Sequence, residues 1–277
     1  MSDGLFILGL GHQKCATSWA YRYLASCGDF RSGFAKEYRV WDAIDIPALA
    51  RNKVPKSLWR RFLKDPQGLG ELGLRLRMQK DPDFYFEYFS RLLSAGGVAA
   101  DMTPSYCGLS VDRLRFIRGQ FARRGVQVKT VILLRDPVER VRSVCRSKIQ
   151  KQNFSEGVPV GCSDLGEAMS THFQHELCVM RTNYPSTIER ARAAFKPSEI
   201  LIGSQEEVAS GELAMNLAHF AGVSHLPHLA RQRVNETFMP SAGTEVDDRV
   251  YDFYRDVYDY CALEFPEIRE LWAYRAA

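Results

Sequence analysis

One segment near the start of the chain reads Gly9-Leu10-Gly11-His12-Gln13-Lys14-Cys15-Ala16-Thr17-Ser18. Residues 5–8 form an apolar run before it that is typical of a buried strand, and residues 19–24 have a helical pattern. Glycine lets the backbone turn tightly beside a ligand, and the start of a helix presents unpaired N–H groups to an anion. The segment therefore predicts a phosphate-binding loop between a strand over residues 5–10 and a helix over residues 18–27, capped by Thr17 or Ser18.

The position of Lys14 separates this loop from the common loop of nucleoside-triphosphate enzymes. In that loop, G-x-x-x-x-G-K-[ST], the lysine stands directly before the hydroxyl residue that starts the helix. Here Lys14 stands three positions before Thr17. The sequence fits G-x-x-K-x-[GA]-T-[ST] instead, with the lysine inside the turn.

A second candidate anion site follows the apolar run at residues 131–134, which predicts the end of a strand over residues 126–134. The chain continues Arg135-Asp136-Pro137-Val138-Glu139-Arg140-Val141-Arg142-Ser143. Pro137 suits the first turn of a helix, because its missing N–H costs nothing there, and a helix is expected over Pro137–Gln150. Arg135 then lies at the carboxyl end of a strand, where open α/β sheets bind ligands. Ser143 lies two helical turns further on and can offer a hydroxyl to the same anion.

These two segments resemble, in order and spacing, two motifs of the sulfotransferases that use 3′-phosphoadenylyl sulfate (PAPS). The heparan-sulfate-type and the bacterial soluble sulfotransferases are the nearest in pattern. The first segment resembles their 5′-phosphosulfate loop, and R-D-P-x-x-R-x-x-S resembles their 3′-phosphate motif. The resemblance implies that PAPS is the cosubstrate and that it is bound by Gly11, His12, Gln13, Lys14, Cys15, Ala16, Thr17, Ser18, Arg135 and Ser143.

Sulfuryl transfer needs a positive group at the leaving phosphate and a base for the proton of the acceptor. Lys14 is the candidate for the first role, and no metal is expected where a lysine and a helix terminus supply the field. Glu37 is the first candidate base, because Lys36-Glu37-Tyr38 resembles the K-E-x-x-F/Y segment of the heparan-sulfate enzymes. It lies on a segment expected to follow the next strand, and it suits the role if partial burial raises its pKa. The alternatives are a surface Lys-Glu pair and His12 as the base.

The acceptor side carries a weaker signal. Thr103-Pro104-Ser105-Tyr106 resembles a T-P-x-Y segment that lines the acceptor cleft of related enzymes. Those enzymes often place Glu-Lys before this threonine, whereas this chain has Asp101-Met102, which favours a smaller or less charged acceptor than a glycosaminoglycan. Residues 231–235 (Arg-Gln-Arg-Val-Asn) are either further cosubstrate contacts or a solvated basic turn. The expected acceptor group is a hydroxyl, or an amine, of a small molecule, lipid or carbohydrate.

Composition narrows the class of protein. The 277 residues are 45% hydrophobic, which is enough for one α/β domain over residues 1–277 with a sizeable core. Arginine outnumbers lysine, as suits bidentate contacts to phosphate or sulfate, and no long basic block indicates a nucleic-acid partner. The seven cysteines form no C-x-x-C pair, and no signal peptide or membrane-spanning run is apparent. We therefore expect reduced thiols in a cytoplasmic protein without a membrane span; the oligomeric state is left open.

Helical and strand patterns alternate along the chain. Helices are expected over residues 82–95, 110–124, 164–182, 185–195, 212–221 and 246–264, with short helices over residues 44–73. Further strands are expected over residues 97–101 and 200–202. Strands separated by helices predict a central parallel sheet flanked by helices, a P-loop-like three-layer α/β fold.

These observations together predict a metal-independent, PAPS-dependent sulfotransferase. Two other functions are compatible with the loop: a P-loop nucleotide kinase or NTPase, which needs magnesium, and a non-catalytic nucleotide-binding module of the same fold. Binding of adenosine 3′,5′-bisphosphate without magnesium distinguishes the first of these alternatives, and turnover distinguishes the second.

Overall fold

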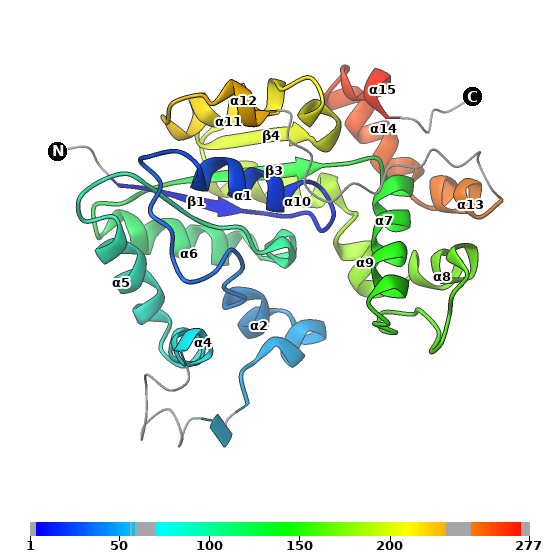
Figure 1. Ribbon diagram of the computed structural model, residues 1–277, viewed down its shortest axis with the longest axis horizontal. Coiled ribbons are helices and arrows are strands. Elements are labelled where there is room, and N and C mark those ends of the chain that lie inside the picture. The colour runs from blue at the N-terminus through cyan, green and yellow to red at the C-terminus, as the bar shows by residue number, and fades with distance from the viewer. Residues whose placement is uncertain (1–3, 56, 59–69, 231–244, 273–277) are drawn as a thin grey trace.

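The computed structural model describes residues 4–55, 57–58, 70–230 and 245–272. At its centre lies a four-stranded sheet in the order β2-β1-β3-β4, in which every neighbouring pair is parallel (Figure 1). The strands are β1 (Leu5–Gly9), β2 (Val98–Asp101), β3 (Gln127–Leu134) and β4 (Ile200–Ser204). Helical crossovers connect them, as a parallel sheet requires. The predicted α/β fold with a central parallel sheet is confirmed.

Side chains of β1 alternate between the two faces of the sheet and enter two separate cores. Phe6 and Leu8 belong to the larger core, and Leu5 and Ile7 to the smaller one. All four are buried, since helices cover both faces of the sheet. The residue pairs Leu8–Asp101 and Leu8–Thr130 set β1 in register between its two neighbours.

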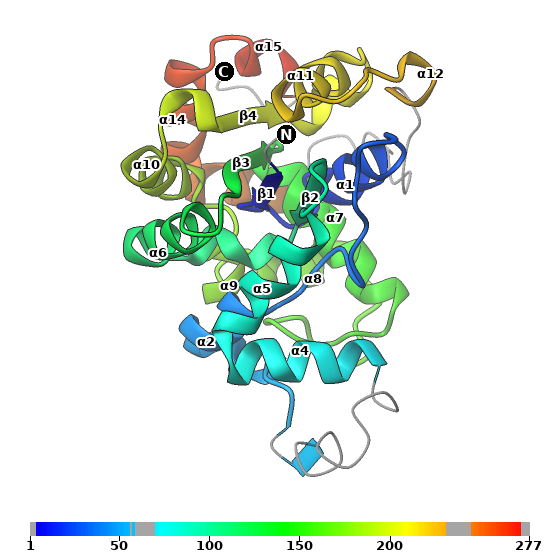
Figure 2. The same ribbon diagram turned by 90° about the vertical axis from the view of Figure 1, so that its left-hand side faces the viewer.

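Helices form one layer on each side of this sheet (Figure 2). On one side, α1 (Thr17–Ala25) and α11 (Glu212–Ala221) supply the smaller core. On the other side, α5 (Pro82–Leu92), α6 (Val111–Ala122) and α10 (Tyr184–Ala194) supply the larger one. The aromatic side chains of α5 pack around Phe6, with Phe89 4.6 Å away between ring centroids. The expected three layers are therefore present.

Helix α7 (Pro137–Gln150) follows β3 directly, with the bounds predicted from the sequence. Asp136 is its N-cap and accepts from the N–H groups of Val138 (2.9 Å) and Glu139 (3.3 Å). The remaining helices are α2 (Trp41–Asp45), α4 (Gly70–Lys80), α8 (Leu165–His172), α9 (Glu176–Met180), α12 (Pro227–Ala230), α13 (Glu245–Phe253), α14 (Arg255–Glu264) and α15 (Ile268–Leu271). Short 3₁₀ turns are η1 (Pro47–Asn52), η2 (Pro104–Gly108), η3 (Pro197–Glu199) and η4 (Gln205–Val208).

Several local predictions were wrong. The N-cap of α1 is Ala16 in a left-handed conformation, so neither Thr17 nor Ser18 caps this helix. The helices expected over residues 164–182 and 246–264 are each broken in two, by the turn before α9 and at Tyr254. In place of a strand before Lys36 there is a single bridge between Phe30 and Val98.

The remaining local predictions concern residues 44–73, residues 231–235, the cysteines and membrane-spanning helices. The expected short helices over residues 44–73 are found in part as η1, and residues 231–235 lie outside the described residues. All seven cysteines are buried and unpaired. In the part of the chain that the structure describes, no helix combines the length and apolar character needed to cross a bilayer.

Candidate functional site

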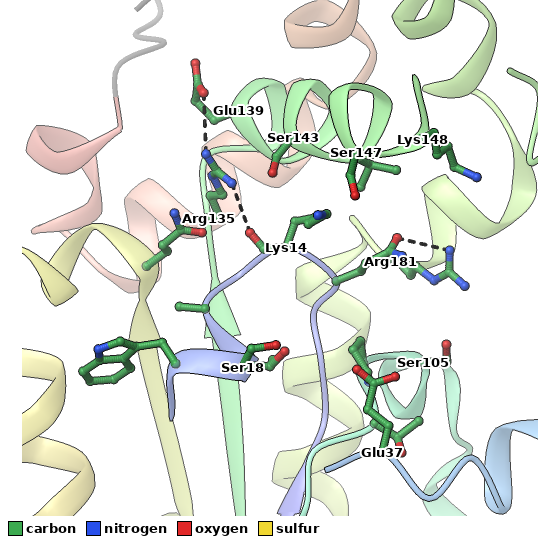
Figure 3. Close-up of a pocket in the computed structure, with 18 of the residues that line it drawn as sticks. Lys14, Ser18, Glu37, Ser105, Arg135, Glu139, Ser143, Ser147, Lys148 and Arg181 are labelled. Atoms are coloured by element: carbon green, nitrogen blue, oxygen red, sulfur yellow. Dashed lines mark hydrogen bonds and ion pairs between the residues drawn. The ribbon is translucent and has the colours of Figure 1, made fainter. Parts of the chain in front are cut away.

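A cleft of about 1160 Å³ opens where β1 and β3 end. Its walls come from the loop between β1 and α1, the start and inner face of α7, and segments around Glu37, Ser105 and Arg181 (Figure 3). Cavities of about 300–1,000 Å³ are usual for small-molecule sites. This cleft therefore has room for more than one small ligand.

The loop between β1 and α1 turns sharply at three left-handed residues. The φ angles are 101° at Gly11, 67° at Lys14 and 59° at Ala16. A side chain at Gly11 would also collide with the Cys107 Cβ and the Pro104 carbonyl oxygen, each 2.9 Å from an added Cβ. Left-handed conformations at non-glycine residues are strained and gather at ligand sites, where they can turn successive N–H groups toward an anion.

The hydroxyls of Thr17 and Ser18 face the ammonium group of Lys36 instead of capping α1. The Lys36 Nζ donates to Thr17 Oγ1 (3.3 Å) and Ser18 Oγ (3.2 Å). These two residues also start the helix, whose first N–H groups have no partner within the helix. The loop and Lys36 thus form a positively charged cradle lined by hydroxyls.

The second predicted anion site lies against this loop. The Arg135 Nη1 donates to the carbonyl oxygen of Lys14 at 3.2 Å, across 121 positions of sequence. The Tyr184 hydroxyl holds Arg135 by donating to its carbonyl oxygen (2.8 Å), and the Arg135 Nη2 lies 3.7 Å from a Glu139 carboxylate oxygen. Ser143 lines the same cleft from the second turn of α7 (Figure 3). The structure therefore brings the two motifs together at one edge of the sheet.

Lys14 is partly buried and lies near two other cations, Lys151 and Arg135. Burial lowers the pKa of its ammonium group, and the nearby charges of Lys151 and Arg135 lower it further. An anion bound between these groups would relieve their mutual repulsion. The positive charges of Lys14, Lys151 and Arg135 thus favour an anion between them.

Glu37 lines the cleft with its carboxylate between two cations. The Lys36 Nζ lies 2.9 Å from Oε1 and the Arg39 Nη2 lies 2.9 Å from Oε2. Burial raises the pKa of Glu37, but the charges and hydrogen bonds of Lys36 and Arg39 outweigh it, so the pKa is lowered. The raised pKa on which the role of base was conditional is therefore not found, because two cations lie within contact distance.

Two other predicted residues point away from the cleft. The His12 side chain is fully buried, and its Nδ1 lies 3.0 Å from the Arg181 carbonyl oxygen. Burial, followed by the charge of Arg140, lowers the pKa of His12 to about 3. The Cys15 thiol is also fully buried, beside the Gln13 carbonyl oxygen. Of the two base candidates, the geometry therefore favours Glu37 over His12.

The cleft is also lined by charged residues that the sequence analysis did not select, among them Lys36, Arg39, Arg51, Lys148, Lys151, Glu156, Arg181 and Glu206. Ser143 and Ser147 on α7 and Lys151 at its C-cap follow one another at intervals of four, which was a usable signal because such residues share one helix face. No local pattern marks Arg181 or Glu156. Among the described residues, no group of three His, Cys, Asp or Glu side chains is arranged to hold a metal ion.

Comparison with solved structures shows which fold this is. A sulfotransferase from Alicyclobacillus acidocaldarius aligns over 95% of this chain and 96% of its own, with a TM-score of 0.57 and 19% sequence identity. The chain has the sulfotransferase fold. The sulfotransferase domains of the Synechococcus PCC 7002 olefin synthase and of the curacin biosynthetic pathway each align over 92% of the chain, at 13% and 10% identity with TM-scores of 0.49. The sequence itself matches no family model and no curated protein.

Within the sulfotransferase fold, the candidate site occupies the usual ligand-binding edge of an open α/β sheet, outside the carboxyl ends of the strands. Thr103, Pro104 and Ser105 line the cleft, whereas Tyr106 is buried and donates to Asp101 (2.8 Å). Asp101 also accepts from Tyr85 (3.0 Å). Asp101 therefore supports the wall of the cleft without contributing to its surface.

Proposed function

We propose that this protein transfers the sulfuryl group of PAPS to a hydroxyl or amine of an acceptor. One observation carries the proposal: Arg135 donates to the loop carbonyl of Lys14, so that two anion-binding groups remote in sequence flank one cleft. A nucleotide with phosphates at both ends of its ribose matches such a pair of sites. The cradle fits the 5′-phosphosulfate end, and Arg135 with Ser143 fits the 3′-phosphate.

Each residue then has a defined part in an in-line displacement. The acceptor oxygen or nitrogen bonds to sulfur, while the bond between sulfur and the bridging oxygen breaks and its electron pair stays on the 5′-phosphate. Lys14 and the loop N–H groups stabilise the charge that develops on this leaving group. Glu37, ionised because its pKa is lowered, receives the acceptor proton. The products are the sulfated acceptor and adenosine 3′,5′-bisphosphate.

Calorimetric titration with adenosine 3′,5′-bisphosphate, with and without magnesium, tests the proposal. We expect tight binding in both conditions. Binding only to magnesium-ATP would overturn it in favour of a nucleotide kinase or NTPase. Binding of the bisphosphate, with no transfer of labelled sulfate from PAPS to any of a broad set of acceptors, would favour a non-catalytic binding module.

A further inference from the structure

The cleft holds a cluster of charges that neither proposed phosphate site uses. Glu156 lies at the centre of this cluster, and only 5% of the Glu156 side chain is exposed. Its carboxylate lies 2.6 Å from the Arg51 Nη2, 3.2 Å from the Lys148 Nζ and 3.1 Å from the Arg181 Nη1. We call these four residues the Glu156 cluster. All of them line the cleft.

The cluster lies beyond the predicted 3′-phosphate contacts. Lys148 follows Ser143 by five residues on α7, which places it about 7.5 Å further along the helix axis. Figure 3 shows Ser143, Ser147 and Lys148 in that order along α7, with Lys148 and Arg181 on the side of the cleft where Glu37 lies. This is the side from which an acceptor would reach the candidate base.

Positive charge is in excess within the Glu156 cluster. Three cations share one carboxylate, and two of them, Lys148 and Arg181, have side chains less than 10% exposed. Among the residues that the structure describes, the Arg181 Nε is buried without a hydrogen-bond partner. Buried cations are costly unless an anion accompanies each of them. Lys148 already donates to the Ser155 carbonyl and hydroxyl oxygens as well as pairing with Glu156, so the spare hydrogen-bond donors belong to the two arginines. Within the described part of the chain, the cluster therefore has an excess of positive charge, and free donors on Arg51 and Arg181, for a second anionic group.

The rest of the lining argues against a flat apolar acceptor. Trp19 on α1 is the one aromatic residue among the described residues that line the cleft. Asn52, Ser105, Asn153 and Ser155 add further polar groups. Hydroxyl and amide side chains at these positions suit a ligand that is rich in hydroxyls.

We propose that the acceptor carries a carboxylate, sulfate or phosphate group that binds to Arg51, Lys148 and Arg181, where Glu156 serves as the internal counter-ion while the acceptor is absent. This inference rests on the proposed sulfotransferase activity and specifies its substrate class. This anionic acceptor differs from the smaller or less charged one that Asp101-Met102 predicted. The positive charges that would bind it come from other segments, namely η1, α7 and the turn after α9.

Two matched sugars test the proposal on protein saturated with adenosine 3′,5′-bisphosphate. Methyl β-glucuronide and methyl β-glucoside differ only in having a carboxylate or a hydroxymethyl group at the same carbon, and ligand-observed NMR titration gives a dissociation constant for each. We expect the glucuronide to bind about tenfold more tightly, as a charge-assisted contact would produce. Equal binding of the two sugars overturns the proposal.

Two variants should change glucuronide binding in opposite directions. Glu156→Gln removes the competing internal anion and should tighten binding about threefold or more, whereas Arg51→Gln removes a cation and should weaken it by a similar factor. Weaker glucuronide binding by a Glu156→Gln protein that is folded by circular dichroism overturns the proposal, as does unchanged binding by Arg51→Gln. Arg51 is half exposed, so Arg51→Gln tests the proposal even if Glu156→Gln fails to fold. Arg91→Gln, on exposed α5 surface outside the cleft, is the matched control.

The same variants separate an acceptor site from a donor site. If Arg51 bound the donor, Arg51→Gln would raise the KM for PAPS; we expect the KM for PAPS and the Kd for adenosine 3′,5′-bisphosphate to stay unchanged. A rise in either value overturns the acceptor role. Failure of the wild-type protein to bind the bisphosphate would instead overturn the proposed function itself.

Discussion

At the scale of single residues, Lys36 links the candidate base to the anion cradle. Its ammonium group contacts Glu37 and the hydroxyls of Thr17 and Ser18 at the same time. An anion bound at the start of α1 would compete with Glu37 for this lysine. A weaker ion pair raises the pKa of a carboxylate, and the carboxylate becomes a stronger base. Donor binding would then strengthen the base when it is needed.

Removing the carboxylate at position 37 should therefore abolish most turnover. We expect Glu37→Gln to lower kcat by about 10²–10⁴-fold, as is usual for loss of a general base, with little change in the Kd for adenosine 3′,5′-bisphosphate. Steady-state kinetics and calorimetry measure the two quantities. Glu87→Gln, an exposed acid on α5 paired with Arg91, is the control. Full activity of Glu37→Gln would exclude Glu37 as the base.

The pH dependence of activity should report the pKa of Glu37 both in the free enzyme and in the substrate complex. The pKa of Glu37 is lowered from its ordinary value of 4.5, so the carboxylate is the ionised, competent form at neutral pH and is lost only on acidification. The pH profile of kcat/KM reports the pKa of Glu37 in the free enzyme, and that of kcat reports it in the substrate complex. We therefore expect kcat/KM to fall in acid with a midpoint below pH 4.5. The midpoint for kcat should lie at higher pH, because the bound donor competes with Glu37 for Lys36. A shared midpoint in both profiles would contradict the competition for Lys36.

Lys14 offers a test of leaving-group stabilisation. Lys14→Gln keeps a long polar side chain at a left-handed position and removes the charge. We expect kcat to fall by about 10²–10³-fold, because the charge acts on the transition state more than on the bound donor. A rise in the KM for PAPS with kcat unchanged would show instead that Lys14 only binds the donor.

At the scale of secondary-structure elements, Glu156 joins parts of the chain that are otherwise separate. Arg51 lies in the last turn of η1, Lys148 lies in the last turn of α7, and Arg181 follows α9. His172 at the end of α8 also contacts the Glu156 carbonyl oxygen (2.6 Å). One loop residue thus holds the far end of the cleft together.

This arrangement predicts a loss of stability in acid. Burial raises the pKa of Glu156, but Arg181 and Lys148 outweigh it and lower the pKa to about 2. A carboxylate whose pKa is lower in the folded than in the unfolded protein stabilises the fold at pH values above its unfolded pKa of 4.5. That contribution is lost as the pH falls toward 2. The shift corresponds to at most about 3 kcal/mol. Urea unfolding should show wild type more stable than Glu156→Gln at pH 7, with the difference much smaller at pH 3; a constant difference would contradict the shift.

At the scale of the whole molecule, strand order explains why the two motifs meet. β1 and β3 are parallel neighbours, so the loop after β1 and the turn after β3 leave the same edge of the sheet side by side. Leu133 reinforces this position, since its carbonyl oxygen accepts from the His12 N–H (3.2 Å). Sequence distance is irrelevant once the strands pair.

That convergence can be measured with two nucleotides. Adenosine 3′,5′-bisphosphate has the 3′-phosphate and AMP lacks it, so Arg135→Ala should weaken binding of the bisphosphate by about 10–100-fold and leave AMP binding nearly unchanged. Arg135→Ala should also raise the KM for PAPS far more than it lowers kcat. Equal loss of both nucleotides would mean that Arg135 supports the loop and does not bind the 3′-phosphate.

Local sequence patterns determined the elements and the two candidate anion sites. Apolar runs predicted β1 and β3, and Pro137 with its helical pattern predicted α7, because burial and backbone geometry at these positions depend on neighbours in sequence. Arg135 and Lys14 were recognisable for the same reason. The breaks after α8 and at Tyr254 were not, and there the Tyr254 hydroxyl donates to the Phe173 carbonyl oxygen (2.5 Å), a contact between segments remote in sequence.

Only the tertiary structure decided the charge states and the far end of the cleft. The buried position of His12, the lowered pKa of Glu37 and the meeting of Arg51, Lys148 and Arg181 at Glu156 all depend on side chains from distant segments. Electrostatic energies depend on distance and burial in space, and a sequence pattern specifies neither between remote residues.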